Sequence, residues 1–349
     1  MYSRPVLLLW FLSLCCTAAR ADWNAAQVIV DEIGRGQHPG IESFVLAADD
    51  AIVSRFVSPE LAGRPPDLRS ATKSVTALLI GIAIDRGEIP SVDARLIDLL
   101  PARHELLARD PLKATLTVRH LLTMRSGLDC NDWDPDSPGH EDRMYRRRDW
   151  VAFWAGQAMR APPGETFSYC TGNVIALGEV LAQATGSTAD VYAQRHLFGP
   201  LGITGPGWAR WNGNRGVDTG GHLRLAPDDL LKIGQLVLDG GVAGGRRIIS
   251  ASWLAAMTTA HADVPGRNQR YGYLWWVDRT RDPALPATDL WWAQGNGGSF
   301  LVVMPGVRAV LAVTGRRFNQ PNALEPMFWL RDRLLPGVAP SGRGDVTTP

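Results

Sequence analysis

Ser70 and Lys73 are the residues whose types and spacing most directly suggest chemistry. They lie three positions apart in DLRSATKSVTALLIGIAIDRG, residues 67–87, which is apolar after its first turn. Residues i and i+3 of an α-helix share one face. A serine hydroxyl needs a base to take its proton before it becomes a good nucleophile. A lysine can be that base when its amine is neutral, so the pair predicts nucleophilic catalysis by Ser70 with Lys73 as its base.

Lysine is rare in this chain, which makes its presence here informative. The 36 basic residues include only three lysines, Lys73, Lys113 and Lys232. Arginine keeps its proton in proteins and would not serve as a base. We expect burial and the positive end of the helix to favour the neutral amine of Lys73, and the other two lysines to be surface residues. A Ser-x-x-Lys pair also arises by chance, so it does not establish a site alone.

The surrounding patterns predict the elements that position this pair. The stretch from Ser70 to Arg86 is apolar on almost every face, which indicates a buried central helix that ends at Gly87. Residues 23–35 suggest a helix, and residues 42–57 suggest two strands that turn at Asp49 and Asp50. Residues 93–196 are largely helical in pattern. Aromatic and β-branched runs between residues 271 and 315 indicate adjacent antiparallel strands, followed by a closing helix. The chain therefore has an α+β pattern.

Two further stretches complete a recognisable set. FSYCTGN places Tyr169 just before a predicted helix, and QGNGGSFLVVMPG places a glycine-rich turn on a predicted strand. With Ser-x-x-Lys, their order and spacing resemble the three motifs of the serine β-lactamase and penicillin-binding protein superfamily. The similarity is greatest to its class C-like branch, which includes esterases, D-amino peptidases and 6-aminohexanoate-dimer hydrolases. Segments such as RHLLTMRSGLD and YGYLWWV extend the resemblance over residues 67–315.

The resemblance implies a fold and a set of roles. The expected fold is β-lactamase/transpeptidase-like, with an antiparallel sheet of N- and C-terminal strands, helices packed on it and an inserted helical subdomain over roughly residues 90–200. Ser70 resembles the acylated nucleophile and Lys73 its base partner. Tyr169 resembles the tyrosine that relays protons to the leaving group and helps to activate the deacylating water. The backbone amides of Ser70 and Ser299 resemble the oxyanion hole.

The sequence departs from the family pattern in two places. Thr171 stands where the Tyr-x-Asn element most often has asparagine, and Asn173 comes two positions later. In the third motif, Asn296 precedes Gly297 and Gly298 where lysine or histidine is usual, and these three residues are expected to bind substrate. A neutral amide holds a carboxylate less strongly than a cation does. We therefore expect esters or linear amides to be better substrates than β-lactams.

The first 21 residues predict a secretory signal peptide. Arg4 precedes an apolar run from Val6 to Cys16, and Ala19-Arg20-Ala21 supplies small residues for cleavage. A lipoprotein signal is the weaker alternative. Cleavage would leave a single hydrolase domain over residues 22–338, with residues 339–349 as a disordered tail, in the periplasm or outside the cell. Cys130 and Cys170 would then be the remaining cysteines, and an oxidising compartment favours a disulfide between them over two buried thiols.

Composition and motifs also exclude several classes. A net charge of +1 does not favour nucleic acid as a partner, and no stretch after the leader predicts stable membrane insertion. The HEDRM stretch lacks the second histidine of a zinc helix. Asp132, Asp134 and Asp136 are interpreted as a solvated acidic loop, with a calcium site as the alternative. We expect no metal and no cofactor. We expect the partner to be a small-molecule substrate. The sequence does not indicate an oligomeric state.

The hypothesis from the sequence is an exported serine hydrolase that acts on small esters or linear amides through an acyl-enzyme. A β-lactamase or D,D-peptidase is the alternative within the same chemistry. A relative that binds or senses a ligand without turning it over is the alternative of another class. Turnover of a fluorogenic ester, as opposed to a burst alone, distinguishes the enzyme from the sensor.

Overall fold

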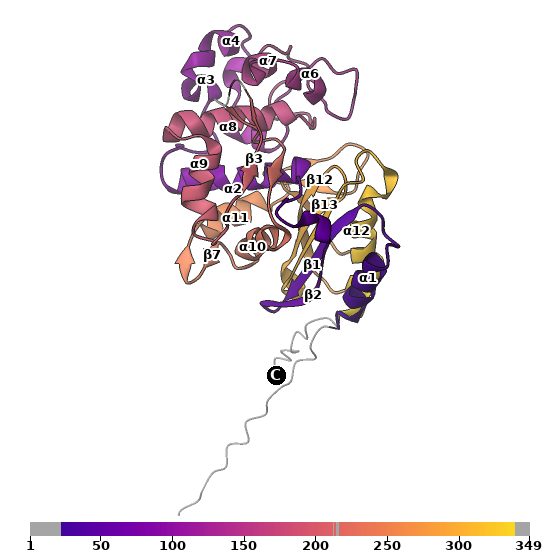
Figure 1. Ribbon diagram of the computed structural model, residues 1–349. Helices are drawn as coiled ribbons and strands as arrows, with labels where there is room; N and C mark the ends of the chain where they lie inside the picture. The colour runs from indigo at the N-terminus through magenta and orange to yellow at the C-terminus, as the bar shows by residue number, and fades with distance from the viewer. Residues whose placement is uncertain (1–21, 212, 214–215, 339–349) are drawn as a thin grey trace, which may run out of the picture.

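The computed structural model describes residues 22–211, 213 and 216–338. The predicted signal peptide and the predicted tail, residues 1–21 and 339–349, lie outside the described residues. The described chain has a sheet-rich half and a helix-rich half, which meet around one long apolar helix (Figure 1). None of the described helices is both long and apolar enough to cross a bilayer.

An eight-stranded antiparallel sheet joins the two ends of the described chain. Its order is β2-β1-β14-β13-β12-β11-β10-β9. The bounds are β1 Ile41–Ala48, β2 Ala51–Val57, β9 Ala262–Asp263, β10 Arg270–Tyr271, β11 Trp276–Arg279, β12 Asp289–Gly295, β13 Ser299–Met304 and β14 Ala309–Gly315. β13 and β14 are buried along their whole length, as continuous apolar runs predict for strands covered on both faces. The predicted strand pair turns at Asp49 and Asp50, both at positive φ.

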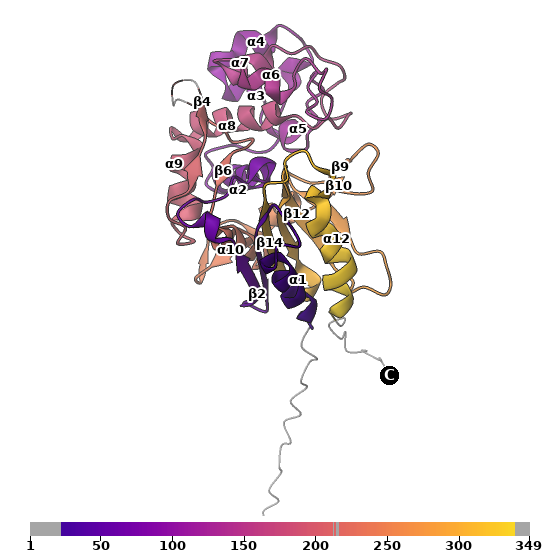
Figure 2. The same ribbon diagram turned by 45° about the vertical axis from the view of Figure 1, so that its right-hand side comes forward.

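Helices cover both faces of this sheet. α1 (Asn24–Gly34) and α12 (Glu325–Trp329) lie together on one face, where Trp329 packs against Phe44 of β1 (Figure 2). α10 (Pro227–Leu238) packs on the opposite face against β13, β14 and β1. α10 begins at Pro227, which suits a first helical position where its missing N–H is not needed.

The inserted half is built from short helices around one longer one. Its helices are α3 Leu96–Leu99, α4 His104–Ala108, α5 Val118–Leu122, α6 Glu141–Tyr145, α7 Trp150–Ala155, α8 Thr171–Thr185 and α9 Ala189–Ala193. α11 (Ala251–Met257) follows α10. The described residues also contain three small two-stranded sheets that the sequence patterns did not predict. They pair β3 Gly207–Trp208 with β6 Leu223–Arg224, β4 Arg210–Trp211 with β5 Gly216–Val217, and β7 Val242–Ala243 with β8 Arg246–Arg247.

α2 (Thr72–Asp85) is the helix that connects the two halves. Twelve of its residues, Thr72 to Ala83, are buried, which confirms the predicted central helix. It contacts α8 in the helical half and β12 in the sheet. Thr76 donates to the carbonyl of Thr219, and Thr219 donates to the carbonyl of Val174 in α8. Because α2 is held from both sides, residues at its start are fixed relative to both halves.

The expectation that Lys113 is a surface residue is wrong. Its side chain is buried, and its Nζ donates to the carbonyl of Ala155 at the end of α7 at 2.7 Å. The long apolar stem packs inside the helical half, and the ammonium satisfies a carbonyl that α7 leaves unbonded at its end.

Candidate active site

Ser70 lies in a tight turn immediately before α2. The turn is a 3₁₀ helix, η2 (Arg69–Ala71), and Arg69 has a φ of +50°. Asp67 accepts from the backbone N–H of Arg69 at 2.8 Å and contacts His222 at 2.8 Å. Left-handed backbone is costly for a residue with a side chain, so it persists only where its surroundings impose it. Ser70 is thus presented at a fixed angle.

The sheet approaches this turn through a glycine. A Cβ on Gly295, at the end of β12, would lie 2.1 Å from the carbonyl oxygen of Leu68. Gly295 pairs with Ser299, the first residue of β13, and η2 packs against both strands. Gly297 and Gly298 in the connecting turn have φ of +97° and +95°, which favours glycine. The structure therefore brings Ser70 beside Ser299 and the third motif.

Lys73 points back to Ser70, as the i and i+3 spacing predicts. Its Nζ lies 3.0 Å from Ser70 Oγ and donates to the carbonyl of Gly220 at 2.7 Å. The side chain is 1% exposed. Tyr169, two residues before α8, completes the group, with its ring centroid 5.2 Å from Lys73 Nζ. Burial raises the pKa of Tyr169, only partly offset by the charge of Lys73 and a side-chain hydrogen bond with Ser70.

Acidic side chains around Lys73 change the expected charge of its amine. Burial lowers the pKa of Lys73, as predicted, but the negative charges of Tyr169 when ionised, Glu141, Asp132 and Asp218 outweigh it, and the pKa is raised above its ordinary value. The surroundings therefore oppose the neutral amine that the sequence predicts. The expectation of a neutral amine considered burial and the helix end, but not these carboxylates.

The acidic groups come from three separate segments. Asp132 and Glu141 both contact Thr171 at the start of α8: the backbone N–H of Thr171 donates to Asp132 at 2.5 Å, and its hydroxyl donates to Glu141 at 2.7 Å. Asp218 is fully buried, and neither of its carboxylate oxygens has a hydrogen-bond partner among the described residues. Burial raises the pKa of both Asp132 and Asp218 to about 6.

The sequence patterns do not predict that these three acidic residues lie near Lys73. The sequence predicts a solvated acidic loop at Asp132, but the Asp132 carboxylate accepts from the first turn of α8. The spacing of Asp132, Glu141 and Asp218 carries no local signal. The described residues contain no group of histidine, cysteine and acidic side chains arranged to hold a metal ion.

The two departures from the family pattern have structural consequences. Asn173 is buried, accepts from Trp154 Nε1 at 2.9 Å and donates to Met124 Sδ at 3.8 Å, so its amide is bonded to residues of the helical half. Asn296 is exposed, and its amide exchanges two hydrogen bonds with Asn319, at 2.8 and 2.9 Å. The side-chain oxygen of Asn296 thus already accepts a hydrogen bond, and its side-chain nitrogen keeps one hydrogen that is not bonded to Asn319.

The predicted disulfide is present and holds the loop beside Tyr169. Cys130 and Cys170 are bonded, with their Cα atoms 5.5 Å apart. Asp132 donates its backbone N–H to the carbonyl of Tyr169 at 2.8 Å. In the same loop, Trp133 stacks on the Tyr169 ring, with centroids 5.1 Å apart and planes at 8°. The bridge therefore fixes the loop against the tyrosine.

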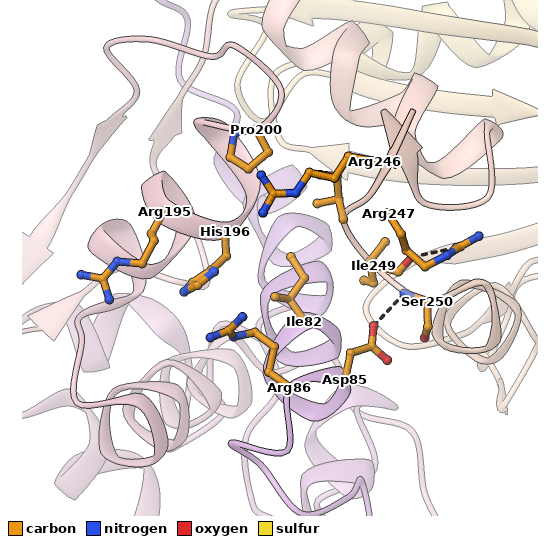
Figure 3. A pocket seen from close by; sticks show the side chains of 11 residues that line it. Ile82, Asp85, Arg86, Arg195, His196, Pro200, Arg246, Arg247, Ile249 and Ser250 are labelled. Carbon is orange, nitrogen blue, oxygen red and sulfur yellow. Dashed lines mark hydrogen bonds between the residues drawn. The ribbon is translucent and has the colours of Figure 1, made fainter. Parts of the chain in front are cut away.

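A separate hollow surrounds the other end of α2. It measures about 390 Å³ and is lined by Arg86 at the end of α2, by the consecutive residues Arg195 and His196, and by Arg246 of β8 (Figure 3). Its lining begins at Ile82, which is roughly 18 Å along the helix from Ser70 at 1.5 Å per residue. This hollow contains neither Lys73 nor Tyr169 and is not the serine site.

Comparisons with known proteins agree with this arrangement. A family model described as Beta-lactamase matches residues 26–332. Penicillin-binding protein 4 of Amycolatopsis lactamdurans is 27% identical over 277 residues, 70% of each chain. The 6-aminohexanoate-dimer hydrolase of Paenarthrobacter ureafaciens is 25% identical over 259 residues, 67% of this chain and 60% of that one. The solved structure of EstCE1, a hydrolase with promiscuous acyltransferase activity, superposes with a TM-score of 0.69 at 18% identity, covering 87% of this chain and 96% of that one.

Proposed function

The chain belongs to the beta-lactamase family, whose members are serine hydrolases, and on that premise we propose that it hydrolyses small esters or linear amides through an acyl-enzyme on Ser70. The family match confirms the resemblance drawn from the three motifs. The observation that carries the proposal is the 3.0 Å hydrogen bond between Lys73 Nζ and Ser70 Oγ, with Tyr169 against the same amine.

The proposed reaction has two halves. Ser70 Oγ bonds to the acyl carbon and gives its proton to the Lys73–Tyr169 pair, and the bond to the alcohol or amine breaks as that group takes a proton from the pair. Water then attacks the acyl-enzyme, its proton passes to the same pair, and the acid leaves as Ser70 is restored. Because its surroundings raise the pKa of Lys73, the amine must first release a proton to solvent water before it can accept one from Ser70.

The oxyanion hole in this proposal is formed by the backbone N–H groups of Ser70 and Ser299. The close approach of Gly295 to Leu68 supports it, because it places the start of β13 beside the turn that holds Ser70. In other acyl-transfer sites, one such donor contributes about 3 to 4 kcal/mol to transition-state binding.

The third motif supports esters and linear amides over β-lactams. A β-lactam carries a carboxylate beside the scissile bond, and the residue that would meet it here is Asn296. That side chain is neutral, and its amide is bonded to Asn319. A neutral donor gives roughly half the strength of a charge-assisted hydrogen bond, so recognition of an adjacent carboxylate should be weak.

Export is part of the same proposal. The Cys130–Cys170 disulfide supports an oxidising compartment, in agreement with the secretory pattern of the first 21 residues. Mass analysis of the periplasmic protein should find a mature N-terminus at Asp22. Full-length protein retained in the cytoplasm with both thiols free would contradict export.

Substrate assays on the purified mature chain test the function. We expect kcat/KM to be higher for p-nitrophenyl butyrate than for nitrocefin or a D-Ala-D-Ala peptide. Ser70→Ala should abolish turnover and covalent labelling. Lys73→Arg should lower kcat/KM by at least about 10²-fold, since a positioned base supplies about 10² to 10⁴-fold.

Lys232→Arg is the matched control for the lysine, because Lys232 pairs with Asp229 on the exposed side of α10 and should retain full activity. Faster hydrolysis of nitrocefin would favour a β-lactamase. A single burst of product without turnover would favour a ligand sensor.

A further inference from the structure

The hollow at the far end of α2 gathers positive charge in a chain that is almost neutral overall. The chain has 36 lysines and arginines and 35 acidic residues, yet among the described residues four arginines and one aspartate line this hollow (Figure 3). Arg86 follows the last residue of α2, Arg195 lies in the helical turn Gln194–Phe198 after α9, and Arg246 and Arg247 form β8. Three segments that are distant in the sequence therefore bring like charges to one place.

Asp85 and Glu88, the acidic residues at the end of α2, already have donors of their own. Asp85 accepts from the backbone N–H of Ser250 at 2.7 Å, which holds the segment after β8 against the end of α2. Glu88 accepts from Arg86 Nε at 2.9 Å and from the hydroxyl of Tyr192. Arg86 is thus the lining arginine with a carboxylate partner, and this partner fixes its position.

The other three lining arginines have no acidic partner in the part of the chain that the structure describes. Arg195 and Arg246 are exposed, and Arg247 donates to the backbone carbonyls of Gly240 at 3.0 Å and Ile249 at 3.2 Å. Like charges that are held close together without a counter-charge repel one another, and a bound anion relieves that repulsion. The hollow therefore has the electrostatics of an anion site.

His196 lines the same hollow and responds to this charge. Burial lowers its pKa, and three of the lining arginines lower it further, while Glu88 acts in the opposite direction. Those arginines are Arg86, Arg195 and Arg246. Their guanidinium groups are therefore close enough to one imidazole to act on it together. A bound group that neutralised them would raise the pKa of His196 again.

We propose that this hollow binds a phosphate or diphosphate group. Arginine donates paired N–H groups to phosphate oxygens. A phosphate directs its oxygens to several sides, so one group can accept from arginines of three segments at once, whereas the two oxygens of a carboxylate lie in one plane on one side. The volume of about 390 Å³ falls within the roughly 300 to 1,000 Å³ of small-molecule sites. The site is apart from Ser70, and binding there does not depend on the proposed hydrolysis.

Isothermal titration calorimetry with sodium pyrophosphate tests the site in the purified mature chain. We expect saturable binding. The double variant Arg195→Gln, Arg246→Gln should raise Kd by about 10-fold, because charge-assisted hydrogen bonds are replaced by neutral ones. In the unmodified protein, Kd should also rise as NaCl increases from about 20 to about 200 mM, since exposed charges are screened. Ser70→Ala should bind pyrophosphate as the unmodified protein does.

The double variant Arg35→Gln, Arg64→Gln is the matched control. It removes the same total charge from two exposed arginines that lie outside the hollow and have no acidic partner among the described residues. Its Kd should stay close to that of the unmodified protein. An equal rise of Kd in both double variants would show attraction to overall charge only and would overturn the proposal.

Proton NMR locates the bound group. Pyrophosphate should raise the pKa of His196, because the anion offsets the charge of the arginines around it, and the resonances of the other histidines should not move. The rise should be lost in Arg195→Gln, Arg246→Gln. Binding that leaves the His196 resonance unchanged would place pyrophosphate elsewhere and would contradict this site.

Vesicles distinguish the two sources of such a group. Cosedimentation with vesicles of phosphatidic acid and phosphatidylcholine, if it is lost in Arg195→Gln, Arg246→Gln, would assign the phosphate to a lipid headgroup. Binding of pyrophosphate without cosedimentation would assign it to a soluble molecule. If neither pyrophosphate nor the vesicles bind in a way that depends on these two arginines, the proposal is wrong.

Discussion

Three acidic side chains surround a lysine that the proposed reaction needs to be neutral. Asp218 is the most unusual of them, because it is fully buried and its carboxylate oxygens have no hydrogen-bond partner among the described residues, with His222 Nε2 4.0 Å from one of them. A buried charge without hydrogen bonds is costly unless an opposite charge lies close. The charges of His222 and Lys73 both act on Asp218, and Asp218 acts on Lys73, so a change at Asp218 should alter the pKa of Lys73.

Replacing Asp218 with asparagine should shift the pH dependence of the reaction. Lys73 must lose its proton, so kcat/KM for p-nitrophenyl butyrate should rise as pH rises through the pKa of the amine. Asp218→Asn removes one of the negative charges that raise this pKa, so the rising limb should move to lower pH. A limb that stays in place, or moves to higher pH, would contradict the assignment of Lys73 as the base.

The same variant should also change stability in a pH-dependent way. The native pKa of Asp218, about 6, lies above the ordinary value of 3.8, so the native state binds a proton that the unfolded state releases. Stability from this group is present below about pH 4 and is lost as pH rises through 6. Asp218→Asn should be more stable than the parent at pH 8, by up to about 3 kcal/mol for a shift of about two units, and equal to it near pH 4. Asp228→Asn, at an exposed pair with Arg55, is the control for both measurements.

Among the elements, the loop that begins at Cys130 has the most direct connection to the site. It carries Asp132 to the start of α8 and Trp133 to the ring of Tyr169. Ser168 also donates to the carbonyl of Cys130 at 2.5 Å. The loop has no regular secondary structure of its own over residues 129–140, so its position depends on the bridge and on these few contacts.

Removing the bridge should cost both stability and activity. In the chain-entropy model, a disulfide that spans 40 residues contributes roughly 3 to 4 kcal/mol. The double variant Cys130→Ser, Cys170→Ser should have a free energy of unfolding lower by about that amount, measured by urea denaturation. Its kcat should also fall, because Trp133 is no longer held against the ring of Tyr169. The parent protein unfolded in the presence of a reductant should match the double variant. Equal stability of the double variant and the oxidised parent would contradict this account.

The whole molecule is joined by pairing between its two ends. β1 pairs with β14 over its full length, with Phe44 opposite Val313, and α2 runs from this sheet half into contact with α8. A core shared in this way should unfold as one unit. The serine site, which takes residues from both halves, should be lost in the same transition.

A substitution that creates a cavity in the core far from Ser70 tests this cooperativity. Phe44 is fully buried against Trp329, and Phe44→Ala should cost about 3 to 5 kcal/mol. We expect ester hydrolysis, tryptophan fluorescence and far-UV circular dichroism to share one denaturant midpoint, lowered equally in the variant. Val28→Ala, at an exposed position of α1, should leave that midpoint nearly unchanged. Activity lost well before the helical signal would show that the halves unfold separately.

Features that depend on neighbours along the chain were predictable from the sequence. Local periodicity and glycine signals predict the helical spacing of Ser70 and Lys73, the central apolar helix and the strands after residue 270. The family resemblance rested on such local motifs and is confirmed by the match over residues 26–332. The cysteine pair was predictable because few partners were available.

Only the tertiary structure determined how the site is charged and what surrounds it. Asp218 lies 145 positions after Lys73 in the chain. The residues around Asp218 show no sequence pattern that distinguishes it from a surface aspartate. The bonding of Asn296 to Asn319 and the stacking of Arg267, Trp133 and Trp276 are likewise contacts between separate segments. Sequence periodicity reports which face of an element is buried, whereas a pKa depends on every charge within a few ångströms. Those distances are set when the sheet half and the helical half pack around α2.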